Sequence, residues 1–423
     1  MTALRVVDLF AGAGGTSTGV AQAAEAIGRG LELVAVNHWQ TAVDTHATNH
    51  PWAQHHCAEI DSLDPRKLVR GRLDLLVASP ECTHHSTARG GRPMSDQSRA
   101  TAWCVVRWAD ALQPRVVLAE NVPEFRTWGP LTTRGRPMKS RAGETFEAWL
   151  TALRSLGYRT SARVLNAADY GDPTTRRRLF VLAWRGRQAA PWADTTHAPR
   201  GEADLFGTRA PWRAAREIID WTLVGQSIFE RKRPLAEKTL ARIAEGLRRF
   251  GGVHLEPFVL QQQSGGAPRL VSEPLPTLAA KGAVSLVEPF LVPRYGERPT
   301  QAPRVHSIDE PLPTVPATCQ HALAEPFLVR YHGTGGAESV DRPLPTITAR
   351  DRFGLVQPAQ LDIRFRMLQP HELAAAMSFP DGYRFCGNRG EVVRQIGNAV
   401  PVSTARALAA GILGQCVATR RSA

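Results

Sequence analysis

The feature that most constrains the fold is an alternation of short apolar runs with longer helical patterns through the first 185 residues. The apolar runs cover residues 4–10, 31–37, 73–78, 115–119, 159–166 and 178–184, and residues 55–58 form a possible short strand. Helical patterns lie between them at residues 16–27, 39–50, 98–112 and 143–156. Strands that alternate with helices predict a doubly wound α/β domain.

Polar side chains recur where these predicted strands end, at Asp8, Asn37, Glu59, Cys82 and Glu120. Ligands of open α/β sheets bind beyond the carboxyl ends of the strands, so these side chains are expected to share one site. Taken alone, Cys82 is either a nucleophile or a small apolar filler. Glu120 is either a functional carboxylate or a solvated one, and its place at a strand exit favours function.

A glycine turn follows the first predicted strand, at residues 11–15, and precedes a helix expected to be capped by Thr16 or Ser17. Such a turn lets a ligand lie against bare backbone at a helix N-terminus. After Gly12 and Gly14, however, Ser17 stands where GxGxxG requires its last glycine. This argues against the fingerprint of nicotinamide- or flavin-binding proteins.

The chain carries a net charge of +13 with a pI of about 10.1, which favours nucleic acid over a membrane surface as partner. A basic surface without a special partner is the alternative. The six cysteines are scattered without zinc-ligand spacing, so no metal is expected. No signal peptide and no apolar run of membrane-spanning length is recognisable, and free thiols fit a reducing cytoplasm. No oligomer is required.

The pattern changes after Trp184, where proline and glycine become dense and only residues 234–250 suggest a helix. An internal repeat follows, in which Glu-Pro-Phe begins at 256, 288 and 325, and Pro-Leu-Pro-Thr ends at 277, 314 and 346. A period of this length is typical of small supersecondary arrays. The prolines predict hairpins or extended segments with defined edges.

Taken together, five ordered motifs resemble those of the DNA (cytosine-5) methyltransferase family. They are DLFAGAGG at residues 8–15, Cys82 with Ser86 four residues later, Glu120-Asn121-Val122, a segment of residues 169–178 similar to one ending in QxRxR, and Gln395-Ile-Gly-Asn398. The sequence also departs from the family pattern. Glu81 replaces the proline before the cysteine, His38 stands where an acidic residue holds the ribose, and Thr174 replaces the glutamine.

The resemblance implies a Rossmann-like methyltransferase sheet that uses S-adenosylmethionine and needs no metal. Cys82 would add to C6 of a flipped-out cytosine, with Glu120 hydrogen-bonding the opposite edge of the ring. Arg176 and Arg178 would anchor the base and lower the thiol pKa. Glu81 works against the thiolate, unless it points outward.

The cofactor would be held by residues from both ends of the chain: Asp8, Phe10, Gly12, Gly14, Gly15, His38, Trp39, Glu59, Ile60, Pro80 and Asn398. DNA contacts are expected from the basic loop after the cysteine and from the repeat region, at Ser86, Arg89, Arg92, Arg294, Arg330 and Arg350. Any single arginine of the repeats is at least as well explained as a solvated side chain. The expected partner is double-stranded DNA, together with a possible cognate restriction enzyme.

The expected domains are a catalytic domain formed by residues 1–185 and 361–423, and an inserted, mostly irregular or β target-recognition domain at 186–360. Three other functions remain open: an RNA cytosine-5 methyltransferase, an inactive DNA-binding relative, and an enzyme that uses a modified donor. The long insert argues against the first. The retained Cys82, Glu120 and Arg178 argue against the second.

Overall fold

A computed structural model describes most of the N-terminal half and the C-terminal segment of the chain, and short pieces of the region between them. The described residues are 3–80, 100–199, 209–223, 226–228, 231–235, 258–261, 268–275, 284–291, 327–330, 337–339, 353–356 and 361–421. They form two compact units. The first comprises Met1–Ile219, Ser272–Gly282 and Gln369–Ala423, and the second comprises Asp220–Val271 and Ala283–Leu368.

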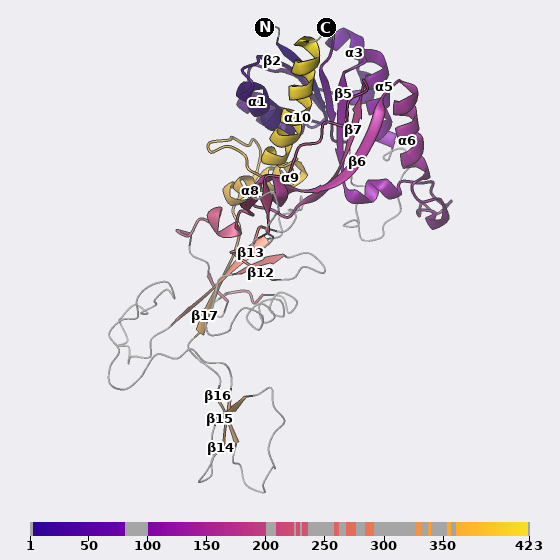
Figure 1. The fold of residues 1–423 in the computed structure, drawn as a ribbon. Helices are drawn as coiled ribbons and strands as arrows, with labels where there is room; N and C mark the ends of the chain where they lie inside the picture. The colour runs from indigo at the N-terminus through magenta and orange to yellow at the C-terminus, as the bar shows by residue number, and fades with distance from the viewer. Residues whose placement is uncertain are drawn as a thin grey trace. The chain divides into compact units, whose positions relative to one another are not determined.

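The first unit is built on a seven-stranded sheet with strand order β3-β2-β1-β4-β5-β7-β6 (Figure 1). All neighbours are parallel except those of β7, which runs antiparallel to β5 and to β6. The strands are β1 (Leu4–Leu9), β2 (Leu31–Asn37), β3 (Gln54–Cys57), β4 (Leu75–Ala78), β5 (Val116–Asn121), β6 (Arg159–Asn166) and β7 (Arg177–Trp184). This confirms the α/β sheet expected from the alternating pattern.

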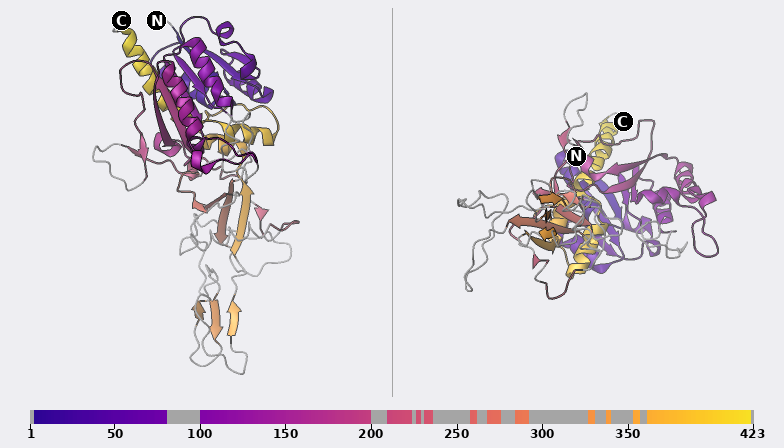
Figure 2. Two further views of the ribbon diagram at one scale, coloured as in Figure 1. Left: turned by 90° about the vertical axis from the view of Figure 1, so that its right-hand side faces the viewer. Right: turned by 90° about the horizontal axis from the view of Figure 1, so that it is seen from below.

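Helices cover both faces of this sheet, as the two further views in Figure 2 show. They are α1 (Gly15–Ala26), α2 (Gln40–Asn49), α3 (Pro65–Leu68), α5 (Trp103–Leu112), α6 (Glu144–Ser155), α8 (Pro370–Ala376), α9 (Arg389–Asn398) and α10 (Val402–Arg421). Short 3-10 turns lie at Ile60–Ser62 (η1), Ala100–Ala102 (η3), Pro123–Thr127 (η4), Lys139–Arg141 (η5), Ala167–Tyr170 (η6) and Ala215–Glu217 (η7). Two-residue strands β8 (His197–Ala198) and β9 (Ala210–Pro211) pair with each other.

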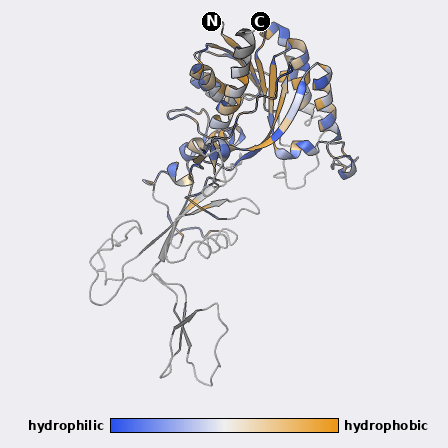
Figure 3. Ribbon diagram, in the orientation of Figure 1, coloured by the Kyte–Doolittle hydropathy of each residue, from blue (hydrophilic) through white to orange (hydrophobic). Residues whose placement is uncertain are grey.

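Alternate residues of the central strands enter two separate cores. Val117 and Ala119 of β5 pack with α5 and α6, whereas Val116 and Leu118 pack on the other face with α1 and α10. Figure 3 shows hydrophobic residues, coloured orange, along these strands. Burial on both faces explains why the strands read as continuous apolar runs.

The C-terminal helix α10 lies beside α1, although the two are almost 400 residues apart in sequence. Gly19 of α1 allows this approach, because a Cβ there would lie 2.6 Å from the Cβ of Ala405. The stretch Arg389–Gly414 is long and apolar enough to cross a membrane, but 67% of its most apolar window is buried inside the protein. Core helices meet the same criterion, so this is weak support for a membrane span.

The second unit contains a five-stranded sheet of order β10-β17-β13-β11-β12 and a three-stranded sheet of order β15-β14-β16, within the described residues. The strands are β10 (Gln226–Ser227), β11 (Phe258–Gln261), β12 (Arg269–Leu270), β13 (Val284–Leu291), β14 (Phe327–Arg330), β15 (Ala337–Ser339), β16 (Phe353–Val356) and β17 (Leu361–Met367). The phenylalanine of each Glu-Pro-Phe repeat falls on a strand. Pro289 lies in the part of β13 that pairs only with β17, where its missing N–H costs no ladder bond to β11. The helix expected at residues 234–250 lies outside the described residues.

Candidate active site

The carboxyl ends of β1, β4 and β5 meet at one edge of the sheet, since Leu9 pairs with Ala78 and Ala78 with Ala119. The chain leaves β1 toward β2 and β3 on one side, whereas β4 and β5 lie on the other side. Such a switch point opens a ligand crevice outside the strand ends. The glycine turn follows β1 there, and Pro80 follows β4. The carboxyl edge therefore has a side near the glycine turn and a side near Glu120.

Glu120 lies near the end of β5 with only 8% of its surface exposed. Antiparallel pairing of β5 with β7 brings Arg178 beside it, with the guanidinium Nε 3.1 Å from Glu120 Oε1. Burial raises the pKa of Glu120, while Arg178, Arg176 and a hydrogen bond from Ser79 act in the opposite direction. Burial and the two guanidinium groups therefore act in opposite directions on the ionisation of this carboxyl group.

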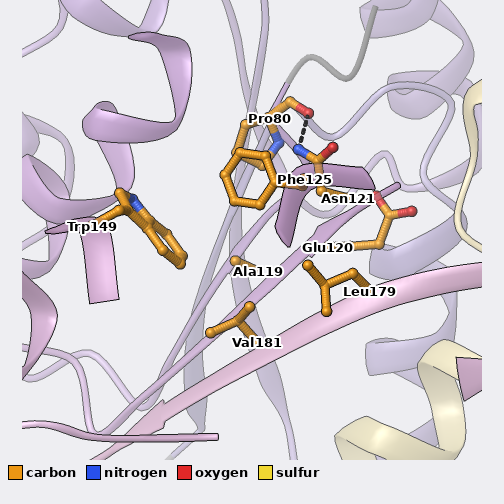
Figure 4. Close-up of a pocket in the computed structure, with 8 residues that line it drawn as sticks. All are labelled: Pro80, Ala119, Glu120, Asn121, Phe125, Trp149, Leu179 and Val181. Atoms are coloured by element: carbon orange, nitrogen blue, oxygen red, sulfur yellow. Dashed lines mark hydrogen bonds between the residues drawn. The ribbon is translucent and has the colours of Figure 1, made fainter. Parts of the chain in front are cut away.

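Asn121 fixes the turn that follows β4. Its side-chain amide donates a 3.1 Å hydrogen bond to the carbonyl oxygen of Pro80 (Figure 4). Its side-chain oxygen accepts a hydrogen bond from the N–H of Val122. A small pocket beside this turn is lined by Pro80, Ala119, Glu120, Asn121, Phe125, Trp149, Leu179 and Val181, and the Glu120 carboxyl group points away from Trp149. The motif Glu120-Asn121-Val122 thus provides both a carboxyl group and a clamp on the neighbouring strand exit.

Arg176 is 2% exposed and follows a segment that Leu275 holds in place. The N–H of Leu275 donates to the carbonyl of Pro173 at 2.9 Å, and the N–H of Thr175 donates to the carbonyl of Leu275 at 2.5 Å. Thr174 is fully buried and forms a parallel bridge with Leu275. The residue that departs from the family pattern therefore pairs with the first Pro-Leu-Pro-Thr copy, a contact that sequence analysis did not predict.

Asp172 links the same segment to the C-terminal helix. Its carboxylate accepts hydrogen bonds from the N–H groups of Ser403 and Thr404 at 3.1 and 2.9 Å, and from the Thr404 hydroxyl at 2.7 Å. These donors lie in the first turn of α10, where a carboxylate satisfies orphan N–H groups. Burial nevertheless raises the pKa of Asp172 to about 6.

On the other side of the crevice, the glycine turn takes positive φ angles at Phe10 (60°), Gly12 (55°) and Gly14 (93°). The expectation that Thr16 or Ser17 caps the following helix is wrong. Gly14 is the N-cap residue, and Thr16 and Ser17 both lie within α1. The Ser17 hydroxyl instead donates a 2.6 Å hydrogen bond to Asp8.

His46 of α2 and His50, the C-cap residue of that helix, pack against this turn. His46 and His50 are 1% and 5% exposed, and a Cβ on Gly14 would lie 3.0 Å from the His46 ring and 3.3 Å from the His50 ring. The Tyr383 hydroxyl donates to the carbonyl of Ala13 at 2.5 Å. Burial lowers the pKa of His46 to about 3 and of His50 to about 4, so both rings are neutral at pH 7. The i, i+4 spacing of the two histidines on a helix was the available signal.

Trp39 begins α2 beyond β2 and lies half-buried under the guanidinium of Arg394, whose Cζ is 4.6 Å from the ring centroid. The backbone N–H of Trp39 donates to the side-chain Oδ1 of the buried Asn37 at 3.0 Å. Arg394 belongs to α9, which ends at Asn398, so this contact brings the C-terminal motif to the exit of β2. Asn398 was expected from the sequence at this site, whereas Arg394 was not.

The remaining expected residues divide into described and undescribed ones. His38 and Glu59 are exposed at the exits of β2 and β3, and Ile60 is buried at the start of η1. Arg330 ends β14, where only the backbone is described, pairing with Phe353. Cys82, Ser86, Arg89, Arg92, Arg294 and Arg350 lie outside the described residues.

The side near the glycine turn presents polar and aromatic groups toward the crevice. The turn at the start of α1 presents helix N–H groups suited to a carboxylate, and Trp39 lies half-buried beyond β2 with one ring face under Arg394. Asp8 Oδ1 is buried without a hydrogen-bond partner among the described residues, and burial raises the Asp8 pKa to about 7. In the part of the chain that the structure describes, no group of three or more His, Cys, Asp or Glu residues could hold a metal ion.

Known proteins resemble the chain in sequence and in fold. The type II methyltransferase M.SacI of Streptomyces achromogenes is 29% identical over 235 residues, which cover 51% of this chain and 57% of that protein. M.Sau3AI of Staphylococcus aureus is 28% identical over 194 residues, or 44% of each chain. The chain thus spans about half the length of the curated relatives it matches.

Two solved structures share the fold at low sequence identity. The DNMT2 mutant of Spodoptera frugiperda aligns with a TM-score of 0.53 at 14% identity, covering 97% of this chain and all of that one. The methyltransferase EhMeth of Entamoeba histolytica aligns with a TM-score of 0.54 at 12% identity, covering 98% and 99%. The C-5 cytosine-specific DNA methylase family matches residues 4–211 and 334–414, more than half of the sequence. This chain therefore belongs to the C-5 cytosine-specific DNA methylase family.

Proposed function

We propose that the protein is an S-adenosylmethionine-dependent DNA (cytosine-5) methyltransferase that acts on duplex DNA. The observation that carries this proposal is the buried pair of Glu120 and Arg178, 3.1 Å apart at the carboxyl edge of the sheet. Cys82 follows Pro80 by two residues in the sequence, and Asn121 clamps the Pro80 carbonyl beside that pair. The proposed reaction centre therefore consists of Cys82, Glu120 and the two arginines, Arg176 and Arg178.

The reaction begins with the thiol of Cys82 and ends with its release. The Cys82 thiolate forms a bond to C6 of the cytosine, and the electron pair of the C5–C6 double bond moves to C5 as Glu120 shares its proton with ring N3. S-adenosylmethionine, when bound, supplies an electrophilic methyl group to C5. Formation of the bond between C5 and the methyl group releases S-adenosylhomocysteine. The C5 proton then passes to water, the electron pair of the C5–H bond re-forms the C5–C6 double bond and expels the Cys82 thiolate, and the N3 proton returns to Glu120.

The direction of the Glu120 pKa shift suits this role, because burial makes the protonated carboxyl group easier to populate than it is in water, and the protonated group can donate to the ring. Arg178 and Arg176 would stabilise the charge that develops on the base and favour the Cys82 thiolate. The second unit, which carries the three Glu-Pro-Phe segments, is proposed to read the DNA sequence. A cognate restriction enzyme is proposed from the type II names of the relatives.

Cys82 can be tested against a matched cysteine. Cys57 is exposed at the end of β3 and serves as the control, whereas burial and the Asp61 carboxylate raise the thiol pKa of Cys104 to about 12. We expect Cys82→Ser to abolish methyl transfer to duplex DNA and the covalent adduct with DNA containing 5-fluorocytosine. Cys57→Ser should retain both. Methylation by Cys82→Ser at the parental rate would contradict the proposal.

The same assay distinguishes the other functions. Methylation of transfer RNA but not of duplex DNA would favour an RNA methyltransferase, and DNA binding without any adduct would favour an inactive relative. Mass spectrometry of the product nucleosides tests for a modified donor, since only a methyl group gives 5-methylcytosine.

A further inference from the structure

A basic hairpin, defined here as residues 130–143, lies between η4 and α6 and has no role in the site described above. Its two sides are joined by a bridge between Leu131 and Pro137. The N–H of Thr132 donates to the carbonyl of Arg136 at 2.7 Å, and the N–H of Met138 donates to that of Pro130 at 3.0 Å. Gly135 occupies the turn at a φ of 67°. The basic hairpin is therefore an ordered element.

The base of the basic hairpin is anchored in the aromatic core. Trp128 is 4% exposed and packs against Phe125, with ring centroids 5.1 Å apart. Its carbonyl accepts hydrogen bonds from the N–H groups of Thr145 and Phe146, both at 3.0 Å. Because Phe125 also lines the pocket beside Glu120, the basic hairpin is attached to the wall of the candidate active site.

The basic hairpin carries cations without matching carboxylates. No Asp or Glu occurs between Glu124 and Glu144, whereas Arg134, Arg136, Lys139 and Arg141 all fall in that interval. Arg141 pairs with Glu144 at the base. The other three side chains are exposed, and none forms an ion pair with any residue in the described ranges.

The basic hairpin also lies at the functional edge of the sheet. It follows β5 and η4 directly, so it leaves the sheet at the edge where Glu120 lies; in Figure 1 this purple segment leads into α6 at the end near that edge. Its sequence Thr-Thr-Arg-Gly-Arg-Pro-Met at 132–138 resembles Thr-Ala-Arg-Gly-Gly-Arg-Pro-Met at 87–94, which follows Cys82. Two segments of similar basic composition thus flank the candidate active site in sequence.

We propose that the basic hairpin binds the phosphate backbone of duplex DNA through Arg134, Arg136 and Lys139, beside the target base. This inference rests on the proposed function, because it takes DNA as the substrate. Exposed cations on an ordered support suit phosphates, since such contacts position the duplex without reading its sequence. The cations add affinity by releasing counterions from the DNA.

The test removes the three charges and compares the result with an equal loss elsewhere. The variant is R134Q/R136Q/K139Q, and the control is R70Q/R72Q/R187Q. The control residues are exposed at the opposite edge of the sheet. Arg70 and Arg72 precede β4. Arg187 follows β7, close in sequence to Arg185, whose N–H donates to the carbonyl of Arg115 before β5. Binding to a duplex without methyl donor is measured across salt concentrations, and KM for DNA and kcat are measured with donor.

For the hairpin variant, we expect the slope of log K against log salt to fall by about 0.9 per lost phosphate contact. At physiological salt this corresponds to binding about 10- to 100-fold weaker for three contacts. KM for DNA should rise similarly while kcat at saturating DNA stays within about twofold. The control should change the slope much less. Equal slopes for variant and control, or a loss of binding confined to RNA, would overturn the inference.

The outcome is separable from that of the proposed function. If the parent protein binds duplex DNA through the basic hairpin but forms no adduct through Cys82, the proposed reaction fails and the hairpin inference stands. If the parent methylates DNA and the hairpin variant behaves like the control, the reaction stands and the hairpin inference fails.

Discussion

The two sides of the carboxyl edge use different physical means. Near the glycine turn, burial favours the neutral forms of the titratable groups: it lowers the pKa of His46 and His50 and raises that of Asp8 to about 7. Near Glu120, burial is combined with opposite charges, and Arg178 lies 3.1 Å from the carboxyl group. Close packing dominates the side near the glycine turn, and the charges of Glu120 and Arg178 dominate the other side.

The difference shows what each side must do. A turn that holds a ligand against its backbone needs a fixed shape, which neutral buried rings and glycines supply without strong fields. A group that exchanges a proton with a substrate needs an ionisation equilibrium that its neighbours can shift. Changes on the first side should therefore affect folding and binding, and changes on the second side the rate of reaction.

The largest effect is expected for Glu120→Gln, which keeps the shape of the side chain but removes its titratable proton. We expect kcat to fall by about 10²- to 10⁴-fold, the usual contribution of a general acid or base. Single-turnover methylation measures the loss, and circular dichroism checks the fold. A variant that keeps its rate would show that the electrostatic side of the comparison is wrongly assigned.

A smaller effect, on stability, is expected for Gly15→Ala beside the glycine turn. A Cβ there would overlap the carbonyl oxygen of Val400 and lie 3.3 Å from the Cβ of Ala399. Overpacking of this kind costs about 1–3 kcal/mol of unfolding free energy. Gly414→Ala in α10 is the control, because no atom lies within 4 Å of the added methyl group, and helix propensity should make it neutral or slightly stabilising. Denaturant unfolding of both variants decides whether shape limits this side.

The smallest effect is a pH dependence that His50 contributes. Its pKa is about 4 in the folded chain and 6.5 ordinarily, so the unfolded chain takes up a proton as the pH falls below 6.5 while the folded chain does not. Stability is therefore lost as the pH falls. Relative to His50→Gln, the wild type should lose about 1 kcal/mol between about pH 7.5 and 5.5, measured by denaturant unfolding at each pH.

The comparison with a variant matters, because Asp8 and Asp172 act in the opposite direction. Their raised pKa values make the folded chain bind more protons than the unfolded chain at acidic pH, so their contributions to stability are lost as the pH rises. Differences between wild type and variant cancel these contributions. The exposed His371 supplies a control, and a curve for His371→Gln that matches the one for His50→Gln would refute the prediction.

The sequence was most informative where burial is two-sided. Strands such as β4 and β5 are buried at every position, because helices cover both faces, and this made them recognisable. Glu120 and Arg178 were found through ordered motifs, and the structure places them together. The catalytic role of Cys82 and the positions of the domain boundaries stay predictions.

Contacts between distant segments could not be found in this way. Tyr383 reaches Ala13 across 370 residues, and Leu275 pairs with Thr174 far along the chain. Neither contact leaves a local pattern, because the pairing depends on how the whole chain folds. The expected helix cap was wrong for a related reason. The Ser17 hydroxyl donates to buried Asp8 and the Thr18 hydroxyl donates to the Gly14 carbonyl, so no side chain caps the N-terminus of α1.

The pairing of Leu275 with the segment before Arg176 has a consequence for protein engineering. The polypeptide passes between the two units at 219/220, 271/272, 282/283 and 368/369, so the second unit is inserted as two separate pieces. A chimera that imports residues 220–368 from a relative as one cassette would also replace the peptide that supports Arg176, an arginine of the proposed reaction centre. Grafts that retain Ser272–Gly282 of this protein should keep turnover. The segments imported from the relative should change only the DNA sequence that is methylated.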